Sequence, residues 1–168
     1  SYNYPALARA GVHITYNRQF IEPARENIRP LRLCKQFDTH VAILKLFPGI
    51  TESVVEAVLN VPNLRGVVLE TFGSGNAPSH EWLYRHLRSA VDRGVVIVNK
   101  TQCNTGSVAM GQYEVSLNLL KAGVISGYDI TTEALLTKMM ILLGELPDNL
   151  PRVRELLGKD ICGEETID

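Results

Sequence analysis

Two polar, glycine-containing segments of this 168-residue chain carry the residue types best suited to hold a small ligand. The first reads Thr71-Phe-Gly-Ser-Gly-Asn-Ala-Pro78 and comes after an apolar run that predicts a β-strand. Gly73 and Gly75 permit a backbone with positive φ and close approach of another molecule, while the Asn76 amide can donate and accept hydrogen bonds. Ligands of open parallel sheets gather at the carboxyl ends of strands. A plain strand-to-helix turn accounts for the same residue types, so both interpretations stay open.

The second segment, Thr101-Gln-Cys-Asn-Thr-Gly-Ser107, also comes after an apolar run, so the two loops could face one crevice. Cys103 supplies a thiol there, but no neighbouring cation in the sequence favours a reactive thiolate. Lone cysteines are most often small buried apolar residues. From residue types alone we therefore expect Cys103 to be buried and structural.

Common catalytic fingerprints are not matched. Pro78 stands where a dinucleotide-binding GxGxxG motif has its third glycine. Ser74 lies in Gly-Ser-Gly rather than in the Gly-x-Ser-x-Gly of a nucleophile elbow, and no histidine is placed to act as its base. The sequence therefore assigns no catalytic residue to this chain.

Composition limits the classes of partner and cofactor. Seventeen basic and eighteen acidic side chains leave a formal charge of −1, so no net field favours nucleic acid or an anionic membrane as partner. The longest apolar runs are strand-sized, too short to cross a bilayer. Cys34, Cys103 and Cys162 form no CxxC pair and no cluster with histidine, so neither disulfides nor a metal site is expected. This cysteine usage suits a reducing cytoplasm.

The spacing of apolar runs predicts an α/β fold. From residue 40 onward, runs rich in Val, Ile and Leu alternate with amphipathic segments, as in βαβ units around a parallel sheet buried on both faces. We predict a three-layer α/β/α domain over residues 39–168, with about four parallel strands at Val41–Phe47, Gly66–Phe72, Val95–Thr101 and Val124–Tyr128.

Five helices are expected between and after these strands, from apolar spacing and terminal capping residues. Their predicted spans run from a Thr51 cap to about Asn60, from a Ser79 cap to Gly94, over Tyr113–Ala122, over Thr132–Leu143 with closure at Gly144, and from Asp148 or Asn149 to Gly158. Asp129, Thr131 and Thr132 are interpreted as capping groups of the fourth helix.

Residues 1–38 differ from the rest because no crossover helix is evident there. Val12–Tyr16 alternates like a strand, and Pro23 and Pro30 interrupt the residues after it. We predict an interdomain linker that pairs locally before the domain begins. Ser1–Pro5 carries no methionine, basic run or apolar leader, and we interpret it as a cut between domains.

Three segments, taken in order, carry a resemblance to a known family: Glu70–Pro78, Asp92–Cys103 and Ala122–Ala134. Further segments agree with the linker and the first strand end of the same family: Ser1–Ala8, Ile14–Arg18 and Leu46–Gly49. Together they resemble the second half of type I, cytoplasmic-type L-asparaginases. The resemblance implies the carboxy-terminal domain of an enzyme that hydrolyses L-asparagine to L-aspartate and ammonia without metal or organic cofactor.

The resemblance also implies that the reacting groups lie on another domain. In that family a threonine nucleophile and a Thr-Asp-Lys group stand on the amino-terminal domain, and none of those motifs is present in this chain. The carboxy-terminal domain completes the substrate site of a neighbouring subunit through a Gly-Asn loop. We carry that substrate-binding role to Asn76, with Tyr113 after the second loop as a further candidate. The implied partners are L-asparagine, an amino-terminal domain, and further copies in a homodimer or homotetramer.

Some bacterial members bind asparagine at a regulatory site on this domain. The site uses a cysteine in a Thr-Gln-Cys motif and an arginine at the end of the second strand. Cys103 is retained here, whereas Glu70 occupies the arginine position and reverses the charge offered to a carboxylate ligand. The resemblance therefore predicts weak or absent regulation of that kind.

Three alternative functions remain open from the sequence. An asparaginase-like subunit of a tRNA-dependent amidotransferase resembles the same core, although the near-neutral charge gives no support for RNA binding. A noncatalytic amino-acid-binding or oligomerisation module would act through the two polar loops. A flavodoxin-like domain would instead bind a phosphorylated ligand at its strand ends.

Overall fold

The computed structural model describes residues 5–21, 32–110 and 114–166. They belong to two compact units, Ser1–Leu33 and Cys34–Asp168. The first unit contains two short antiparallel strands, β1 (Ala8–Ala10) and β2 (Ile14–Tyr16), followed by a 3-10 helix, η1 (Arg18–Phe20). Local pairing of the strand predicted at Val12–Tyr16 is thus confirmed for its last three residues.

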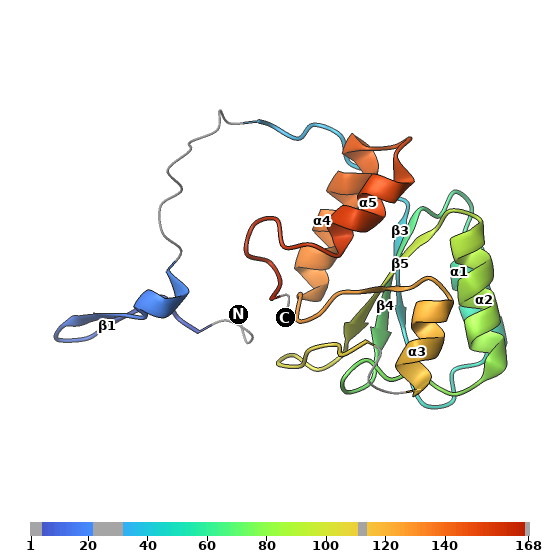
Figure 1. Cartoon of the computed structure of the whole chain (residues 1–168), viewed down its shortest axis with the longest axis horizontal. Helices are drawn as coiled ribbons and strands as arrows, with labels where there is room; N and C mark the ends of the chain where they lie inside the picture. The colour runs from blue at the N-terminus through green and yellow to red at the C-terminus, as the bar shows by residue number, and fades with distance from the viewer. Residues whose placement is uncertain (1–4, 22–31, 111–113, 167–168) are drawn as a thin grey trace. The chain divides into compact units, whose positions relative to one another are not determined.

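The second unit is an α/β domain with one four-stranded parallel sheet, ordered β3-β4-β5-β6 (Figure 1). A helix connects each strand to the next one, as parallel strands require. The elements in order are β3 (Val41–Lys45), α1 (Glu52–Leu59), β4 (Gly66–Thr71), α2 (Glu81–Asp92), β5 (Val96–Thr101), α3 (Glu114–Lys121), β6 (Ile125–Ser126), α4 (Thr132–Glu145) and α5 (Leu150–Leu157). The predicted fold class and four parallel strands are confirmed.

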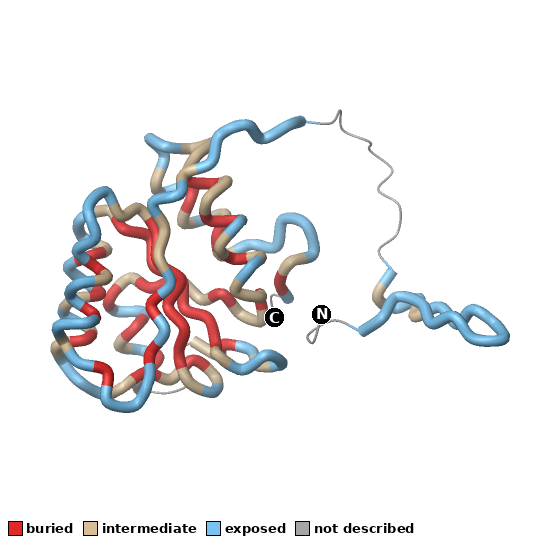
Figure 2. The backbone as a smooth tube through the Cα atoms, turned by 180° about the vertical axis from the view of Figure 1, so that it is seen from behind, coloured by how far each residue is buried: buried red, intermediate tan, exposed pale blue. Residues whose placement is uncertain are grey.

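Helices α1, α2 and α3 cover one face of the sheet, and α4 and α5 cover the other. Every residue of β4 and β5 is buried, as the continuous red of the central strands shows (Figure 2). Successive side chains of a strand point to opposite faces, so Val67 and Leu69 enter the core against α1–α3, whereas Val68 enters the core against α4 and α5. Strands buried in this way carry apolar runs, here over residues 67–69 and 96–98, and these runs could be recognised in the sequence.

Several predicted boundaries were wrong by one or more residues. Strand β3 ends at Lys45 and β6 has two residues, so both are shorter than their apolar runs. The cap of α2 is His80 rather than Ser79. Helix α4 continues through Gly144, where a Cβ atom would lie 2.5 Å from the carbonyl oxygen of Gln36. Gly144 therefore allows another segment to pack on the helix and does not end it.

The capping groups of the last two helices are partly as predicted. Thr131 caps α4 and Asn149 caps α5, because each side chain accepts a bond from the backbone N–H three residues further on, at 3.3 and 3.2 Å. Asp129, predicted as a cap, instead accepts a 2.7 Å bond from the backbone N–H of Thr166. That bond holds the segment after α5 against the loop after β6.

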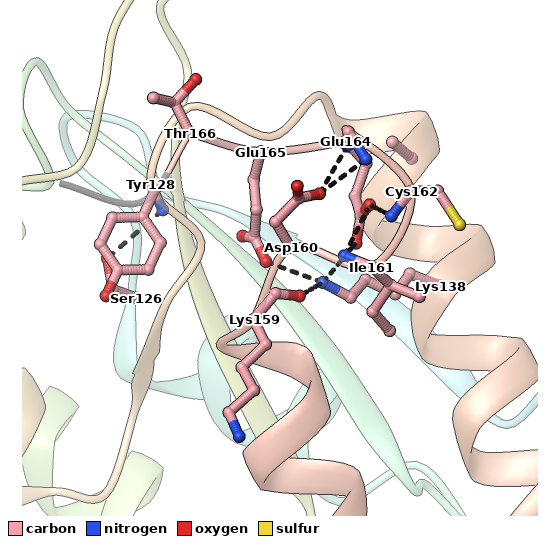
Figure 3. A network of polar contacts seen from close by, with 12 residues as sticks. Ser126, Tyr128, Lys138, Lys159, Asp160, Ile161, Cys162, Glu164, Glu165 and Thr166 are labelled. Atoms are coloured by element: carbon pink, nitrogen blue, oxygen red, sulfur yellow. Dashed lines mark hydrogen bonds and ion pairs between the residues drawn. The ribbon is translucent and has the colours of Figure 1, made fainter. Parts of the chain in front are cut away.

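A buried lysine fixes the same carboxy-terminal segment to α4 (Figure 3). Lys138 Nζ lies 2.7 Å from a carboxylate oxygen of Glu164, 2.7 Å from one of Glu165, and 2.7 Å from the carbonyl oxygen of Lys159. Burial raises the pKa of Glu165, whose Oε2 has no hydrogen-bond partner among the described residues. Burial opposes ionisation of Glu164 too, yet bonds from Lys138 and the Cys162 N–H lower the pKa of Glu164 to about 2.

Replacing Lys138 with methionine is expected to lower the free energy of unfolding by about 3–5 kcal/mol, because the buried Glu165 then loses its cation. Urea denaturation of the chain measures this change. The matched control is Lys159→Met, which removes a 57% exposed lysine whose partner, Glu155, is 44% exposed, and should cost less than about 1 kcal/mol. Equal losses in the two variants would contradict the role given to Lys138.

Candidate functional site

The carboxyl ends of β4 and β5 carry buried polar side chains on both faces of the sheet. Glu70 pairs in register with Lys100, and Thr71 with Thr101. Because side chains alternate, Thr71, Asn99 and Thr101 point to the α1–α3 face, whereas Glu70 and Lys100 point to the α4 face. All five are buried. A buried polar group is costly unless it is hydrogen-bonded, so each must meet a partner from a nearby segment.

On the α1–α3 face lies a tight turn, Phe72–Asn76, which we call the Gly-Asn turn. The backbone N–H of each terminal residue donates to the carbonyl oxygen of the other, both at 2.8 Å. Gly73 and Gly75 have φ values of +49° and +104°, which confirms the use predicted for these glycines. At Gly75 a Cβ atom would also lie 2.8 Å from Val108 Cγ1, so the neighbouring loop closes over this position.

The Asn76 side chain is a polar group that this turn presents, in addition to the Ser74 hydroxyl. Asn76 is partly buried, and among the described residues its amide has no hydrogen-bond partner. An amide held on a shaped turn offers one acceptor and two donors to a ligand. The geometry at Asn76 thus suits binding and orientation of a small polar molecule rather than bond breaking.

Three consecutive carbonyl oxygens of the Gly-Asn turn accept hydrogen bonds from β5 and the loop after it. The bonds run from Thr101 Oγ1 to Gly73, from the Ala109 N–H to Ser74 at 3.1 Å, and from Asn99 Nδ2 to Gly75 at 3.4 Å. The two polar loops, expected to face one crevice, are therefore joined directly to each other.

The expected burial of Cys103 was wrong, because this thiol is exposed. Strand β5 ends at Thr101, and the chain then folds back, with the Gly106 N–H donating to the Cys103 carbonyl oxygen at 3.3 Å. Gly106 also lies close to Cys103, because a Cβ atom at Gly106 would lie 3.0 Å from the Cys103 Cβ atom. The Cys103 backbone is thus hydrogen-bonded within the loop, while the residue itself is exposed.

Glu70, on the opposite face, links three elements. Its carboxylate accepts a 2.7 Å bond from Thr132 Oγ1 at the start of α4 and lies 3.4 Å from Lys45 Nζ on β3. A carboxylate near a helix amino terminus is also favoured by the helix dipole. Within the described residues, no hydrogen bond or ion pair joins Glu70 to Cys103. The side-chain amide of Gln102, the residue before Cys103, donates to the Glu70 carbonyl oxygen at 3.0 Å.

Three further observations concern the predicted contact at Tyr113, metal binding and membrane spans. Tyr113, the other predicted substrate contact, lies outside the described residues. In the part of the chain that the structure describes, no group of three or more His, Cys, Asp or Glu side chains could hold a metal ion. In that same part, no helix has the length and apolar character needed to cross a membrane.

Thr71 and Asn99 were not predicted as site residues, although their side chains are hydrogen-bonded to each other beneath the Gly-Asn turn. Thr71 Oγ1 donates to Asn99 Oδ1 at 2.7 Å, which leaves the Asn99 amide nitrogen directed to Gly75. A usable signal was present in the sequence: Asn99 interrupts an apolar run predicted to be buried on both faces. A polar residue in such a run must have a nearby partner.

Comparison with known proteins identifies the family. Residues 40–157 match the family model described as the Glutaminase/Asparaginase C-terminal domain. A 60 kDa lysophospholipase of Homo sapiens is 42% identical over 98% of this chain and 28% of its own length. L-asparaginase 1 of Escherichia coli is 37% identical over 99% of this chain and 48% of its own length. A glutamyl-tRNA(Gln) amidotransferase subunit from Methanobrevibacter smithii is 32% identical over 98% of this chain and 37% of its own length.

The fold is similar to that of a solved enzyme. The crystal structure of L-asparaginase I from Vibrio cholerae matches with a TM-score of 0.84 and 34% identity, covering 98% of this chain and 49% of that protein. The chain thus spans half or less of each of these proteins. In both sequence and fold, this chain belongs to the glutaminase/asparaginase C-terminal domain family.

Proposed function

We propose that this chain is the carboxy-terminal domain of an L-asparaginase that hydrolyses L-asparagine to L-aspartate and ammonia. Its similarity to E. coli L-asparaginase 1 runs along nearly the whole chain. The observation that carries the proposal is the Asn76 amide, which no described residue engages and which stands on a turn held at three successive carbonyls. The nucleophile and its activating groups would lie on an amino-terminal domain.

In this proposal Asn76 orients the substrate. An amino acid carries an ammonium group, which needs acceptors, and a carboxylate, which needs donors; a side-chain amide supplies both. Holding a reactant in the correct geometry can contribute several powers of ten to a rate. Tyr113 is the second proposed contact. The proposed partners are the amino-terminal domain and further copies in a homodimer or homotetramer, in the cytoplasm, and the chemistry requires no cofactor.

Two relatives carry names that point to activities other than asparagine hydrolysis, because one is named a lysophospholipase and the other an amidotransferase subunit. Each differs from an asparaginase in its substrate. An acyl ester of a lysophospholipid, free asparagine and an aminoacyl-tRNA can therefore be offered to the same preparation. A noncatalytic amino-acid-binding module would bind asparagine and release no ammonia.

Ammonia release from L-asparagine is expected from the full-length protein that contains this chain and not from the chain alone, because the reacting groups are placed on the other domain. A coupled ammonia assay on both preparations measures it. Parallel assays follow fatty-acid release from lysophosphatidylcholine and amide transfer to glutamyl-tRNA. Robust ammonia release by the chain alone would overturn the proposed division of labour, and activity on only the other substrates would overturn the proposed reaction.

Replacing Asn76 with alanine in the full-length protein is expected to lower kcat/KM for asparagine about tenfold or more, since an orienting hydrogen-bonding group is lost. The thermal midpoint should stay within about 2 °C, because no described residue depends on this amide. Asn104→Ala in the neighbouring exposed loop is the matched control and should leave turnover unchanged. Equal kinetics for the two variants would remove Asn76 from the site.

Regulation by asparagine through Cys103 and Glu70 is proposed to be weak or absent. The Glu70 carboxylate repels a carboxylate ligand and is already bonded to Thr132 and close to Lys45. The rate should therefore rise hyperbolically with asparagine concentration in the wild-type full-length protein. A sigmoidal curve that Cys103→Ala makes hyperbolic would contradict this expectation.

A further inference from the structure

We propose that Thr101 is a positioning residue whose hydroxyl fixes the Gly-Asn turn to the sheet and thereby sets the place of the Asn76 amide. Its effect on turnover rests on the proposed function, whereas its effect on the turn does not. Thr101 Oγ1 is hydrogen-bonded to both polar loops, at Gly73 in the first and at Cys103 in the second.

Thr101 is the last residue of β5 and is 1% exposed. Its Oγ1 donates to the carbonyl oxygen of Gly73 and accepts from the backbone N–H of Cys103 at 3.0 Å. A hydroxyl has one donor, so the bond to Gly73 uses the whole donor capacity of this group. Gly106 completes the enclosure, because a Cβ atom there would lie 3.1 Å from Thr101 Cγ2.

The bonds within the Gly-Asn turn do not fix its position on the sheet. The paired N–H and carbonyl groups of Phe72 and Asn76 shape the turn but join it to nothing else. Its attachments to β5 and the following loop are the bonds from Thr101, Asn99 and Ala109. Because the Asn99 bond is long, at 3.4 Å, Thr101 is the side chain that holds the turn most closely.

A threonine suits this position better than other residues of similar size. Branching at Cβ restricts χ1, so the hydroxyl direction is fixed by the strand backbone. Valine has the same shape but would leave the Gly73 carbonyl without its donor and the Cys103 N–H without its acceptor. Serine keeps the hydroxyl and can restore both bonds. The Val and Ser variants therefore separate the hydrogen bonds from the packing.

The test compares wild type with Thr101→Val and Thr101→Ser. In the chain itself, NMR hydrogen exchange of the Asn76 and Cys103 N–H groups should be about tenfold faster with Val and close to wild type with Ser. In the full-length protein, kcat/KM for asparagine should fall about tenfold with Val and recover with Ser. If Thr101→Val does not fold, Thr101→Ala removes the same hydroxyl with less crowding and is interpreted in the same way.

The outcomes distinguish this proposal from the proposed function. Unchanged exchange in the Val variant, or equal exchange in the Val and Ser variants, would overturn the positioning role whatever the activity. Faster exchange with unchanged turnover would overturn the link between the turn and the substrate. Faster exchange in a protein whose wild-type form does not hydrolyse asparagine would support the positioning of the turn and reject the asparaginase proposal.

Discussion

Burial of the polar end of β5 is the constraint on which the rest of the site depends. Asn99, Lys100 and Thr101 close a strand that is covered on both faces. A buried donor or acceptor without a partner costs about 1–3 kcal/mol, so neighbouring segments must supply partners. Carbonyl groups of the Gly-Asn turn meet Asn99 and Thr101, and the Thr101 carbonyl meets Lys100 at 2.6 Å. The Gly-Asn turn is therefore placed where its carbonyl oxygens accept the hydrogen bonds of these side chains.

Alternation along the strands then separates two roles that are adjacent in sequence. Thr71 faces the Gly-Asn turn, whereas Glu70, its neighbour, faces α4 and bonds Thr132. The turn that carries the proposed substrate contact and the Glu70 side chain, for which weak or absent regulation is proposed, therefore belong to opposite faces of one sheet. Glu70 and Thr71 on β4, like Lys100 and Thr101 on β5, are successive residues that connect those faces covalently. A change at Glu70 would first affect the packing of α4 and only indirectly Asn76.

The sequence predicted the features that depend on local patterns and missed those that depend on distant partners. The four parallel strands follow from apolar runs, because strands that are buried on both faces need apolar side chains on both faces. The exposure of Cys103 depends on the direction in which the chain leaves β5, and the role of Gly144 depends on Gln36. Asn99 and Thr101 meet backbone groups 24 and 28 residues away, which residue types alone do not reveal.

A domain that orients a substrate without reacting with it has a specific structural need: its contact group must stay in place when the rest of the enzyme closes around the ligand. A misplacement of about 1 Å can cost about a hundredfold in rate, so orientation requires a rigid support. The polar segments Thr71–Pro78 and Thr101–Ser107 are hydrogen-bonded to each other through Thr101, which suits them to that proposed role. Under the proposed function, both loops that resemble one enzyme family serve the same end, which is the support of Asn76.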